Sequence, residues 1–165
     1  ASNTNAYFEF CRFVNCGRGN FAAIDGATTV GMTLTTSISH CSFIECGNST
    51  AGAVVIMTGR QTVRDSVFQD NYQSCASIHS TSKITDYTGI YHYGTGSIGS
   101  PEAIGDTPVT GTLVGKPYAD PVAGDWTVSS ELSAIESSDG MTPGAVQATG
   151  GTSRPTHPLL SQVIG

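Results

Sequence analysis

Charged residues are scarce in this chain of 165 residues, since Asp, Glu, Lys and Arg together make up only 12% of it. An ordinary soluble domain carries roughly 25%. The 7 Lys and Arg residues are outnumbered by 13 Asp and Glu residues, which gives a net charge of −6. Nucleic-acid binding needs a cationic surface that displaces phosphate counterions, so this balance argues against a nucleic-acid partner.

Long apolar runs are also missing. No run approaches the roughly 18 to 20 residues needed to cross a bilayer, so we expect no membrane span. The chain opens at Ala1 without a charged and apolar leader, and we expect it to be a mature product or a piece of a longer polypeptide.

Proline is absent before residue 101 and cysteine is absent after residue 75. This partition, together with the Gly/Ser-rich stretch 94–101, predicts a boundary there. We expect a C-terminal extension rich in Pro and Gly that reaches out and docks on a neighbouring chain. The predicted organisation is repeated strands over 1–93, a linker or irregular connection over 94–117, a closing coil or cap over 118–140, and an extended tail over 141–165.

One short motif is present three times, as Phe13-Val14-Asn15-Cys16, Phe43-Ile44-Glu45-Cys46 and Phe68-Gln69-Asp70-Asn71. The phenylalanines lie 30 and 25 positions apart. A second landmark keeps step, because the apolar residues Ile24, Val54 and Ile78 lie 30 and 24 positions apart. Two landmarks that move together across three copies predict a repeated structural unit.

The repeat has the pattern of strands and turns. Short runs such as Tyr7-Phe8-Glu9-Phe10 alternate with period two, and Gly-rich corners such as Cys46-Gly47-Asn48 separate them. No amphipathic helix of three turns is evident in the repeated region. We therefore predict an all-β fold, a parallel β-helix of about three coils that lie about 4.8 Å apart, with about three strands in each coil.

Residues that recur at the same place in such a coil stack on one another. Phe13, Phe43 and Phe68 are predicted to form an inward aromatic column. Cys16, Cys46 and Asn71 are predicted to form a polar ladder at the turn that follows, where side chains satisfy backbone groups.

The three Phe-x-x-Asn-like motifs, with Phe21-Ala-Ala-Ile24 and Gly52-Ala-Val-Val55 between them, resemble the right-handed parallel β-helix (pectin-lyase-like) superfamily. Proteins of this kind include phage tail spikes and fibres and bacterial surface adhesins. The resemblance covers roughly residues 6–85 and implies a right-handed parallel β-helix. It departs from the family pattern at two of the three Asn positions, which are Cys. Its motifs are specific to a fold and not to an activity.

A second stretch, from Asp120-Pro121 through Gly124-Asp125-Trp126 to Ser133-Ala134-Ile135, is similar to the closing segment of bacterial and phage β-helix proteins. The similarity implies a final coil or cap near residues 118–140. Trp126 would then pack over the open lumen, and the alternative is that it binds a sugar.

Five cysteines leave two alternatives open. Cys11 and Cys16 are predicted to lie over Cys41 and Cys46, at a spacing that a disulfide tolerates. Stacked parallel side chains do not readily adopt the disulfide dihedral angle, so a reduced ladder is favoured over vertical disulfides. No Cys or His spacing matches a zinc site, and we expect no metal and no cofactor.

Acidic residues supply the candidates for catalysis. Glu45 and Asp70 occupy the same place after their Phe residues and could project from adjacent coils, with Asp65 and Arg64 nearby. The alternative is a solvated polar turn, because Asn15 fills the same column. Tyr87, Tyr91, Tyr93 and Trp126 are candidates for stacking on a sugar or a partner chain, and capping the core is their alternative role.

The sequence favours a structural and adhesive role over an enzymatic one. We expect an extracellular module of a virion (fibre, spike or capsid decoration) or of a bacterial cell surface. A short stack exposes two apolar ends, which predicts a homo-oligomer such as a trimer, or a larger assembly. The first alternative is a polysaccharide depolymerase, either a lyase or a glycoside hydrolase, that uses carboxylates on the β-helix face. The second is a non-catalytic module that binds a glycan.

Overall fold

The computed structural model describes residues 3–16, 23–26, 33–47, 53–57, 60–72, 76–78, 83–84, 86–94, 102–103, 109–137 and 139–148. Within these ranges nearly all regular structure is β-strand, and the helix there, α1 (Ser130–Ser133), is 4 residues long. The predicted all-β class is therefore confirmed. Cys75 and residues 149–165 lie outside the described residues.

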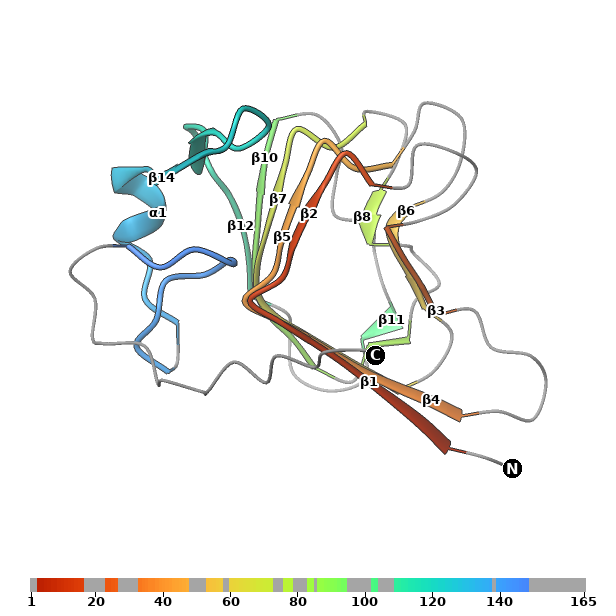
Figure 1. Cartoon of the computed structure of the whole chain (residues 1–165). Helices are drawn as coiled ribbons and strands as arrows, with labels where there is room; N and C mark the ends of the chain where they lie inside the picture. The colour runs from red at the N-terminus through yellow and green to blue at the C-terminus, as the bar shows by residue number, and fades with distance from the viewer. Residues whose placement is uncertain are drawn as a thin grey trace, which may run out of the picture.

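Seven parallel strands form the main sheet (Figure 1). It contains β1 (Asn3–Glu9), β4 (Thr33–Ser39), β7 (Arg60–Gln69), β10 (Asp86–Tyr93) and β12 (Val109–Thr112) in that spatial order, with β2 (Arg12–Val14) and β5 (Ser42–Ile44) continuing β1 and β4. We call each pass of the chain through this sheet a row. The register pairs Phe13 with Phe43 and Phe43 with Phe68, so residues 30 and 25 positions apart become neighbours.

Left-handed backbone conformation marks two points in each of the first four rows. At the first corner φ is 52° for Phe10, 46° for His40, 47° for Asp65 and 69° for Gly89. At the second corner φ is 54° for Asn15, 48° for Glu45, 50° for Asp70 and 80° for Gly94. At the first corner these four rows bend the same way, which divides the main sheet into the lower arm and the upper arm seen in Figure 1.

The inner face of the main sheet carries an aromatic stack. The rings of Phe13 and Phe43 lie 4.7 Å apart and 4° from parallel, and those of Phe43 and Phe68 lie 4.7 Å apart and 8° from parallel. Ile38 and Val63 are fully buried beside them. Because the ring spacing matches the distance between neighbouring strands, each ring fills one row of the interior.

A second parallel sheet, in the order β3 (Ile24–Gly26), β6 (Ala53–Met57), β8 (Ala76–Ile78), lies opposite the main sheet, and Ile24 joins the same buried cluster. Its register corrects one sequence alignment, because Ile24 pairs with Val55 and not with Val54. The segment from Ile24 to its partner in β6 is therefore one residue longer than the motif suggested. A shift of one residue in register moves a side chain to the other face of the sheet.

Two smaller sheets complete the described strands. β9 (Lys83–Ile84) and β11 (Glu102–Ala103) pair in parallel, and β13 (Tyr118–Asp120) and β14 (Asp125–Val128) form an antiparallel hairpin. The described strands form separate sheets, and none of these sheets closes on itself.

The main sheet continues beyond the three Phe-marked rows. In the fourth row His92 lies beside Phe68, and Gly89 and Gly94 stand at the two corners. In the fifth, β12 pairs with β10 within the stretch predicted as a connection. A Cβ at Gly94 would collide with the Asp70 carboxylate, so the corners of these rows are closely packed.

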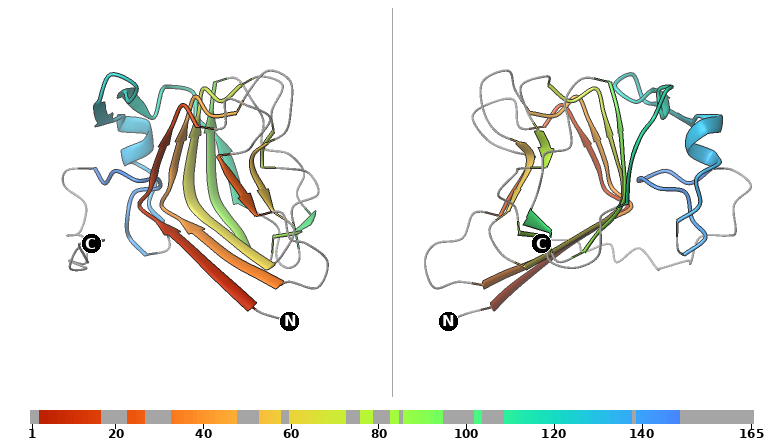
Figure 2. Two further views of the ribbon diagram at one scale, coloured as in Figure 1. Left: turned by 45° about the vertical axis from the view of Figure 1, so that its right-hand side comes forward. Right: turned by 180° about the vertical axis from the view of Figure 1, so that it is seen from behind.

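Residues 113–137 and 139–148, which we call the strap, fold back over the outer face of the upper arm (Figures 1 and 2). Tyr118 is fully buried there and its hydroxyl lies 2.7 Å from the Ser42 hydroxyl oxygen. The Ala145 N–H donates to the same oxygen at 2.8 Å, and the Gly144 N–H donates to the Asp65 carbonyl at 2.7 Å. Residues 141–148, predicted to dock on a neighbour, therefore pack on their own chain.

The start of α1 helps to hold the strap at the edge of the sheet. Ser129 caps the helix by accepting a hydrogen bond from the Leu132 N–H at 3.1 Å. The Glu131 carboxylate accepts hydrogen bonds from the N–H groups of Val114 and Gly115 at 2.9 and 2.8 Å. Leu132 is fully buried against the upper arm.

Candidate functional site

The carboxylates proposed as a catalytic pair stand at equivalent corners of adjacent rows. Glu45 and Asp70 both occupy the second corner, and their N–H groups donate to the carbonyls of Gln69 and Tyr93 at 3.0 and 2.9 Å. Asn, Asp and Gly adopt left-handed backbone more readily than other residues, and three of the four residues at this corner are of those types. The corner geometry therefore accounts for Asp70 without a catalytic role.

Asp70 also has a charged partner. Its Oδ2 lies 3.8 Å from Nζ of Lys116, whose side chain is 56% exposed. Such a pair at the surface contributes only about 0 to 1 kcal/mol. Arg64 is exposed on the lower arm, where it is the neighbour of Ser39 in the preceding row, and Ser39 in turn is the neighbour of Glu9. The structure thus places Arg64 before the first corner and Asp70 after the second.

Asp65 is the most buried of the acidic candidates, with 8% of its surface exposed at the first corner. Burial raises the pKa of its carboxyl, the charge of Asp139 raises it further, and Ser137, His40 and Arg64 oppose the shift. The Nε2 atom of the buried His40 lies 3.5 Å from Oδ2 of Asp139, a residue of the strap. This first-corner cluster, made of His40, Asp65, Ser137 and Asp139, brings together three ionisable side chains and one hydroxyl.

The cluster offers acid–base groups but little access. His40 and Asp65 of the sheet and Ser137 of the strap are buried, and within this cluster only Asp139 is exposed. A polysaccharide chain could reach the buried carboxyl only if the strap moved. Its geometry therefore suits an attachment point between the strap and the sheet better than a catalytic centre.

The four described cysteines, Cys11, Cys16, Cys41 and Cys46, line the inner side of the corners as free thiols. The Cys11 and Cys41 thiols and the Ser66 hydroxyl each donate to the carbonyl two residues earlier in the chain, at 3.5, 3.3 and 2.7 Å. Cys16 and Cys46 repeat this contact at 3.4 and 3.3 Å. In successive rows a thiol or a hydroxyl therefore donates a hydrogen bond to the backbone carbonyl at the equivalent position.

Burial also suppresses the reactivity of the inner thiols. It raises the pKa of both Cys41 and Cys46 to about 12. Because the thiolate is the reactive form, these two residues are poor nucleophiles at neutral pH. The second-corner ladder continues at Asn71, whose Oδ1 accepts a hydrogen bond from the Cys46 N–H at 2.9 Å.

The described aromatic candidates lie on the outer face of the upper arm, where the strap partly covers them. Tyr91, Tyr93 and Trp126 are half-buried in the cluster beneath the strap. The side chain of Tyr87 lies outside the described residues. Burial, and secondly the charge of Asp65, raise the pKa of Tyr91. These rings hold the strap on the sheet.

Trp126 packs on the outer face of the upper arm. The sequence had suggested a place over the open lumen, at the end of the stack, and the structure corrects that prediction. Its ring meets Tyr118 edge to face at 5.2 Å, and the Arg12 guanidinium lies 4.5 Å from the ring centroid. A sugar could stack on that face only by displacing Arg12, at the cost of a cation–π contact of about 0.5 to 1 kcal/mol.

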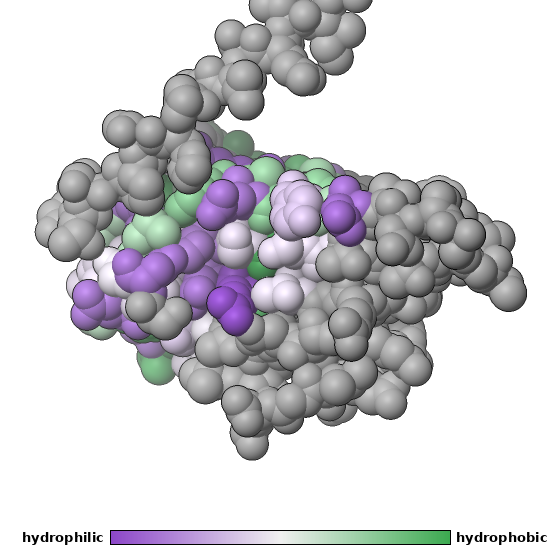
Figure 3. Space-filling view, turned by 90° about the horizontal axis from the view of Figure 1, so that it is seen from below, coloured by the Kyte–Doolittle hydropathy of each residue, from purple (hydrophilic) through white to green (hydrophobic). Residues whose placement is uncertain are grey.

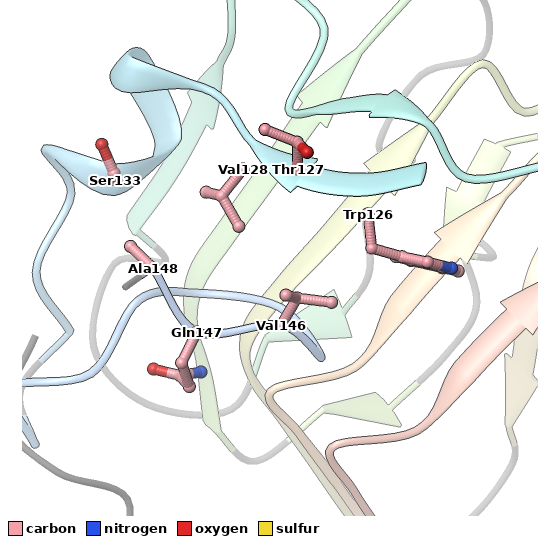
Figure 4. Close-up of a pocket in the computed structure, with 7 residues that line it drawn as sticks. All are labelled: Trp126, Thr127, Val128, Ser133, Val146, Gln147 and Ala148. Atoms are coloured by element: carbon pink, nitrogen blue, oxygen red, sulfur yellow. The ribbon is translucent and has the colours of Figure 1, made fainter. Parts of the chain in front are cut away.

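A cleft of about 370 Å³ opens between β14 and residues 146–148 (Figure 4). Val128, Val146 and Trp126 supply apolar walls. The Gln147 amide is already engaged, because its Nε2 donates to the Thr142 carbonyl at 2.9 Å and its Oε1 accepts from the Thr142 N–H at 2.8 Å. The cleft therefore has few polar groups left to orient a sugar.

The first row forms an open edge of the main sheet. Phe8, Cys11, Phe13, Val14 and Cys16 are only half-buried there. Their counterparts one row further on include the fully buried Cys41, Phe43, Ile44 and Cys46. Tyr7 on β1 is 72% exposed. In the described part of the chain, β1 has a neighbouring strand on one side only.

The outer face of the lower arm is polar. Tyr7, Ser37 and Thr62 are neighbours across three rows, and Glu9, Ser39 and Arg64 form the next set. Seen from below, purple and pale residues make up much of the described surface (Figure 3).

No helix in the described part of the chain is both long and apolar enough to pass through a membrane. Among the same residues, no three His, Cys, Asp or Glu side chains converge in a way that could hold a metal ion.

No protein-family model, curated protein or solved structure matches this chain. The site residues are therefore judged on geometry alone.

Sequence reasoning missed the residues through which the strap attaches. Ser42, Tyr118 and Asp139 lie 76 or more positions from the side chains they meet, and no motif links them. The left-handed corners had a partial signal, because Asn15, Asp70 and Gly94 are residue types that favour that conformation.

Proposed function

We propose that the chain is part of a right-handed parallel β-helix of the pectin-lyase-like kind, acting as a structural and adhesive module of a virion fibre, spike or capsid decoration, or of a bacterial cell surface. Support comes from the in-register parallel rows, the two corners repeated in four of them, and the aromatic stack. Such a module would be extracellular and would act through assembly and surface contact.

The open edge of the first row carries the proposal. The ring of Phe13 stacks on Phe43 through one face, and the residue remains half-buried where Phe43 and Phe68 are fully buried. An edge strand presents free N–H and C=O groups that pair readily with another strand. A second copy of the chain, in a trimer or a larger assembly, would cover both the ring and the strand.

Backbone direction shows how to block this edge. The Phe10 N–H donates to the Ser39 carbonyl on β4. Because N–H groups alternate sides along a strand, the Tyr7 N–H points away from β4 and toward the open edge. Tyr7→Pro removes that N–H while leaving the hydrogen bonds to β4 intact, and Tyr7→Thr is the matched control that keeps it.

Analytical ultracentrifugation tests the proposal. The wild-type chain and Tyr7→Thr are expected to sediment as trimers or larger species, and Tyr7→Pro as a smaller one. A wild-type chain that stayed monomeric at every concentration up to the millimolar range would refute the assembly role. If Tyr7→Pro assembled like wild type, the contact would lie elsewhere than β1.

Catalysis is left out of the proposal because the corner geometry and the contact with Lys116 account for Asp70, the partner that a pair with Glu45 would need. Glycan binding remains an open function of the assembled surface. A glycan array that compares wild-type protein with Tyr7→Thr would show whether the exposed ring of Tyr7 contributes to it.

A further inference from the structure

Backbone N–H groups at the second corner find their acceptors in the row that follows. In the first three rows the N–H of the corner residue donates to a carbonyl of the next row. These pairs are Asn15 with Ile44, Glu45 with Gln69, and Asp70 with Tyr93, at 3.0, 3.0 and 2.9 Å. One position further on, the Cys46 N–H donates to a side chain of the next row, Oδ1 of Asn71, at 2.9 Å. The second row therefore takes both a carbonyl and a side-chain acceptor from its successor.

The fifth row has no successor among the described strands, because β12 is an outermost strand of the main sheet. The register pairs His92 with Thr112, so Val114 stands where Gly94 marks the second corner of the fourth row. The Leu113 N–H points back and donates to the His92 carbonyl at 2.8 Å. Because N–H groups alternate sides along the chain, the Val114 N–H points away from the fourth row, toward the end of the stack.

The Glu131 carboxylate takes the place of a further row at this end. Its Oε1 accepts a hydrogen bond from the Val114 N–H at 2.9 Å, and its Oε2 accepts one from the Gly115 N–H at 2.8 Å. Gly115 follows the corner position as Cys46 does in the second row. The hydrogen bonds from Val114 and Gly115 lower the pKa of Glu131. Val114 is 91% exposed and Gly115 is also exposed, so the carboxylate and not apolar packing covers these N–H groups.

We propose that Glu131 caps the β12 end of the rows and keeps the first row of a second copy from adding there. The first row fits this end, because its Val14 carbonyl and Cys16 thiol stand at the positions that supply the acceptors in later rows. Repeated addition of this kind would build an open filament. With the β12 end capped, assembly stops at a finite size. That the excluded partner is a second copy rests on the assembly role proposed above.

A block on the first row allows the β12 end to be tested by itself. The Ser42 N–H donates to the Cys11 carbonyl in the first row at 2.9 Å, and Arg12 is the neighbour of Ser42 in that row. The Arg12 N–H therefore points the same way, toward the open edge. Arg12→Pro removes that N–H, and Arg12→Thr is the matched control that keeps it.

A labelled peptide with the sequence of residues 33–47 is the probe, because this segment forms the second row. Fluorescence anisotropy under reducing conditions measures its binding. In the Arg12→Pro background, Glu131→Ala is expected to bind the peptide about tenfold more tightly, because the N–H groups at the end of the stack become free for hydrogen bonds. Glu136→Gln removes an exposed strap carboxylate outside the cap and should leave the affinity unchanged.

Analytical ultracentrifugation follows the cap in the assembling protein. Wild type should reach a limiting size, whereas Glu131→Ala, alone or together with Arg12→Thr, should keep growing as concentration rises. Arg12→Pro in the Glu131→Ala chain should stop that growth, because the first row can no longer add to β12.

Amide exchange on the wild-type chain tests the cap without any substitution. The Val114 and Gly115 N–H groups should be protected although both residues are exposed, and exchange at the rate of an unstructured peptide would overturn the cap. The cap is also wrong if Glu131→Ala, with the circular dichroism spectrum of wild type, neither grows nor binds the peptide more tightly. A monomeric wild type whose Glu131→Ala variant binds the peptide more tightly would refute the assembly role and leave the cap standing.

Discussion

At the scale of single residues, the backbone corners decide which side chains recur. Among the described residues, six other than glycine adopt positive φ, and all six stand at the two corners: Phe10, Asn15, His40, Glu45, Asp65 and Asp70. Left-handed backbone costs an ordinary residue about 1 to 2 kcal/mol. The stacked rows impose this conformation even where the residue type opposes it.

Substitution at Glu45 tests its role at the second corner. Glu45→Asn is expected to keep the free energy of unfolding within about 0.5 kcal/mol of wild type, because Asn adopts left-handed backbone at modest cost. Glu45→Val should lower it by about 1 to 2 kcal/mol, since a β-branched residue is strained there. Urea titration measures both. Equal stabilities for the two variants would contradict the corner assignment.

Alkylation tests the state of the cysteines. With a pKa of about 12, the Cys41 and Cys46 thiols should resist iodoacetamide at pH 8 in the folded protein. The half-buried Cys11 and Cys16 should react first. Mass spectrometry of tryptic peptides locates the label. Detection of Cys11–Cys41 or Cys16–Cys46 disulfides in freshly purified protein would show that the alternative pairing is correct.

At the scale of elements, the strap is a continuous cover that depends on a few backbone contacts. Gly144 has φ of 91°, and a Cβ there would collide with the Tyr118 hydroxyl and lie 3.0 Å from the Ser42 hydroxyl oxygen. The hydroxyl of Tyr118 is itself buried, which raises its pKa to about 12. The strap therefore approaches the first corner as closely as glycine allows.

A pair of glycines isolates this close approach. Gly144→Ala and Gly124→Ala both place alanine at positive φ, 91° and 93°, but the Cβ at Gly124 would meet nothing within 4 Å. Gly124→Ala should cost about 1 to 2 kcal/mol, and Gly144→Ala about 1 to 3 kcal/mol more because of the collision. Thermal unfolding followed by Trp126 fluorescence compares them. Similar losses would mean that Gly144 does not pack against Tyr118 and Ser42 as described.

The sequence predicted the elements that repeat a residue type and missed those that do not. The Phe column and the parallel pairing of the first three rows follow from the spacing of Phe13, Phe43 and Phe68. The fourth row has His92 in place of Phe, so nothing marked it. Within the strap, residues 118–140 were predicted as a closing coil or cap from a resemblance, and residues 141–148 as part of an extended tail. Its contacts join residues such as Ser42 and Ala145, 103 positions apart, which no local pattern encodes.

At the scale of the whole molecule, the two faces of the main sheet are covered by different parts of the chain. The inner face carries Phe43 and Phe68, which share a buried cluster with Ile24 of β3. The outer face of the upper arm is covered by the strap. The first row alone keeps half-buried aromatic rings along an open strand edge. Among the described residues β12 is the other outermost strand of this sheet, and the proposed assembly is assigned to the edge of the first row because of its half-buried rings.

The central claim is that successive passes of the chain stack in register, and nuclear Overhauser effects between phenylalanine rings test it most directly. In protein with selectively labelled Phe, the account predicts ring-to-ring effects between Phe13 and Phe43 and between Phe43 and Phe68, which lie 4.7 Å apart. It predicts none between Phe13 and Phe68, which are two rows apart. The absence of both neighbouring contacts, or a direct contact between Phe13 and Phe68, would contradict the stacked arrangement.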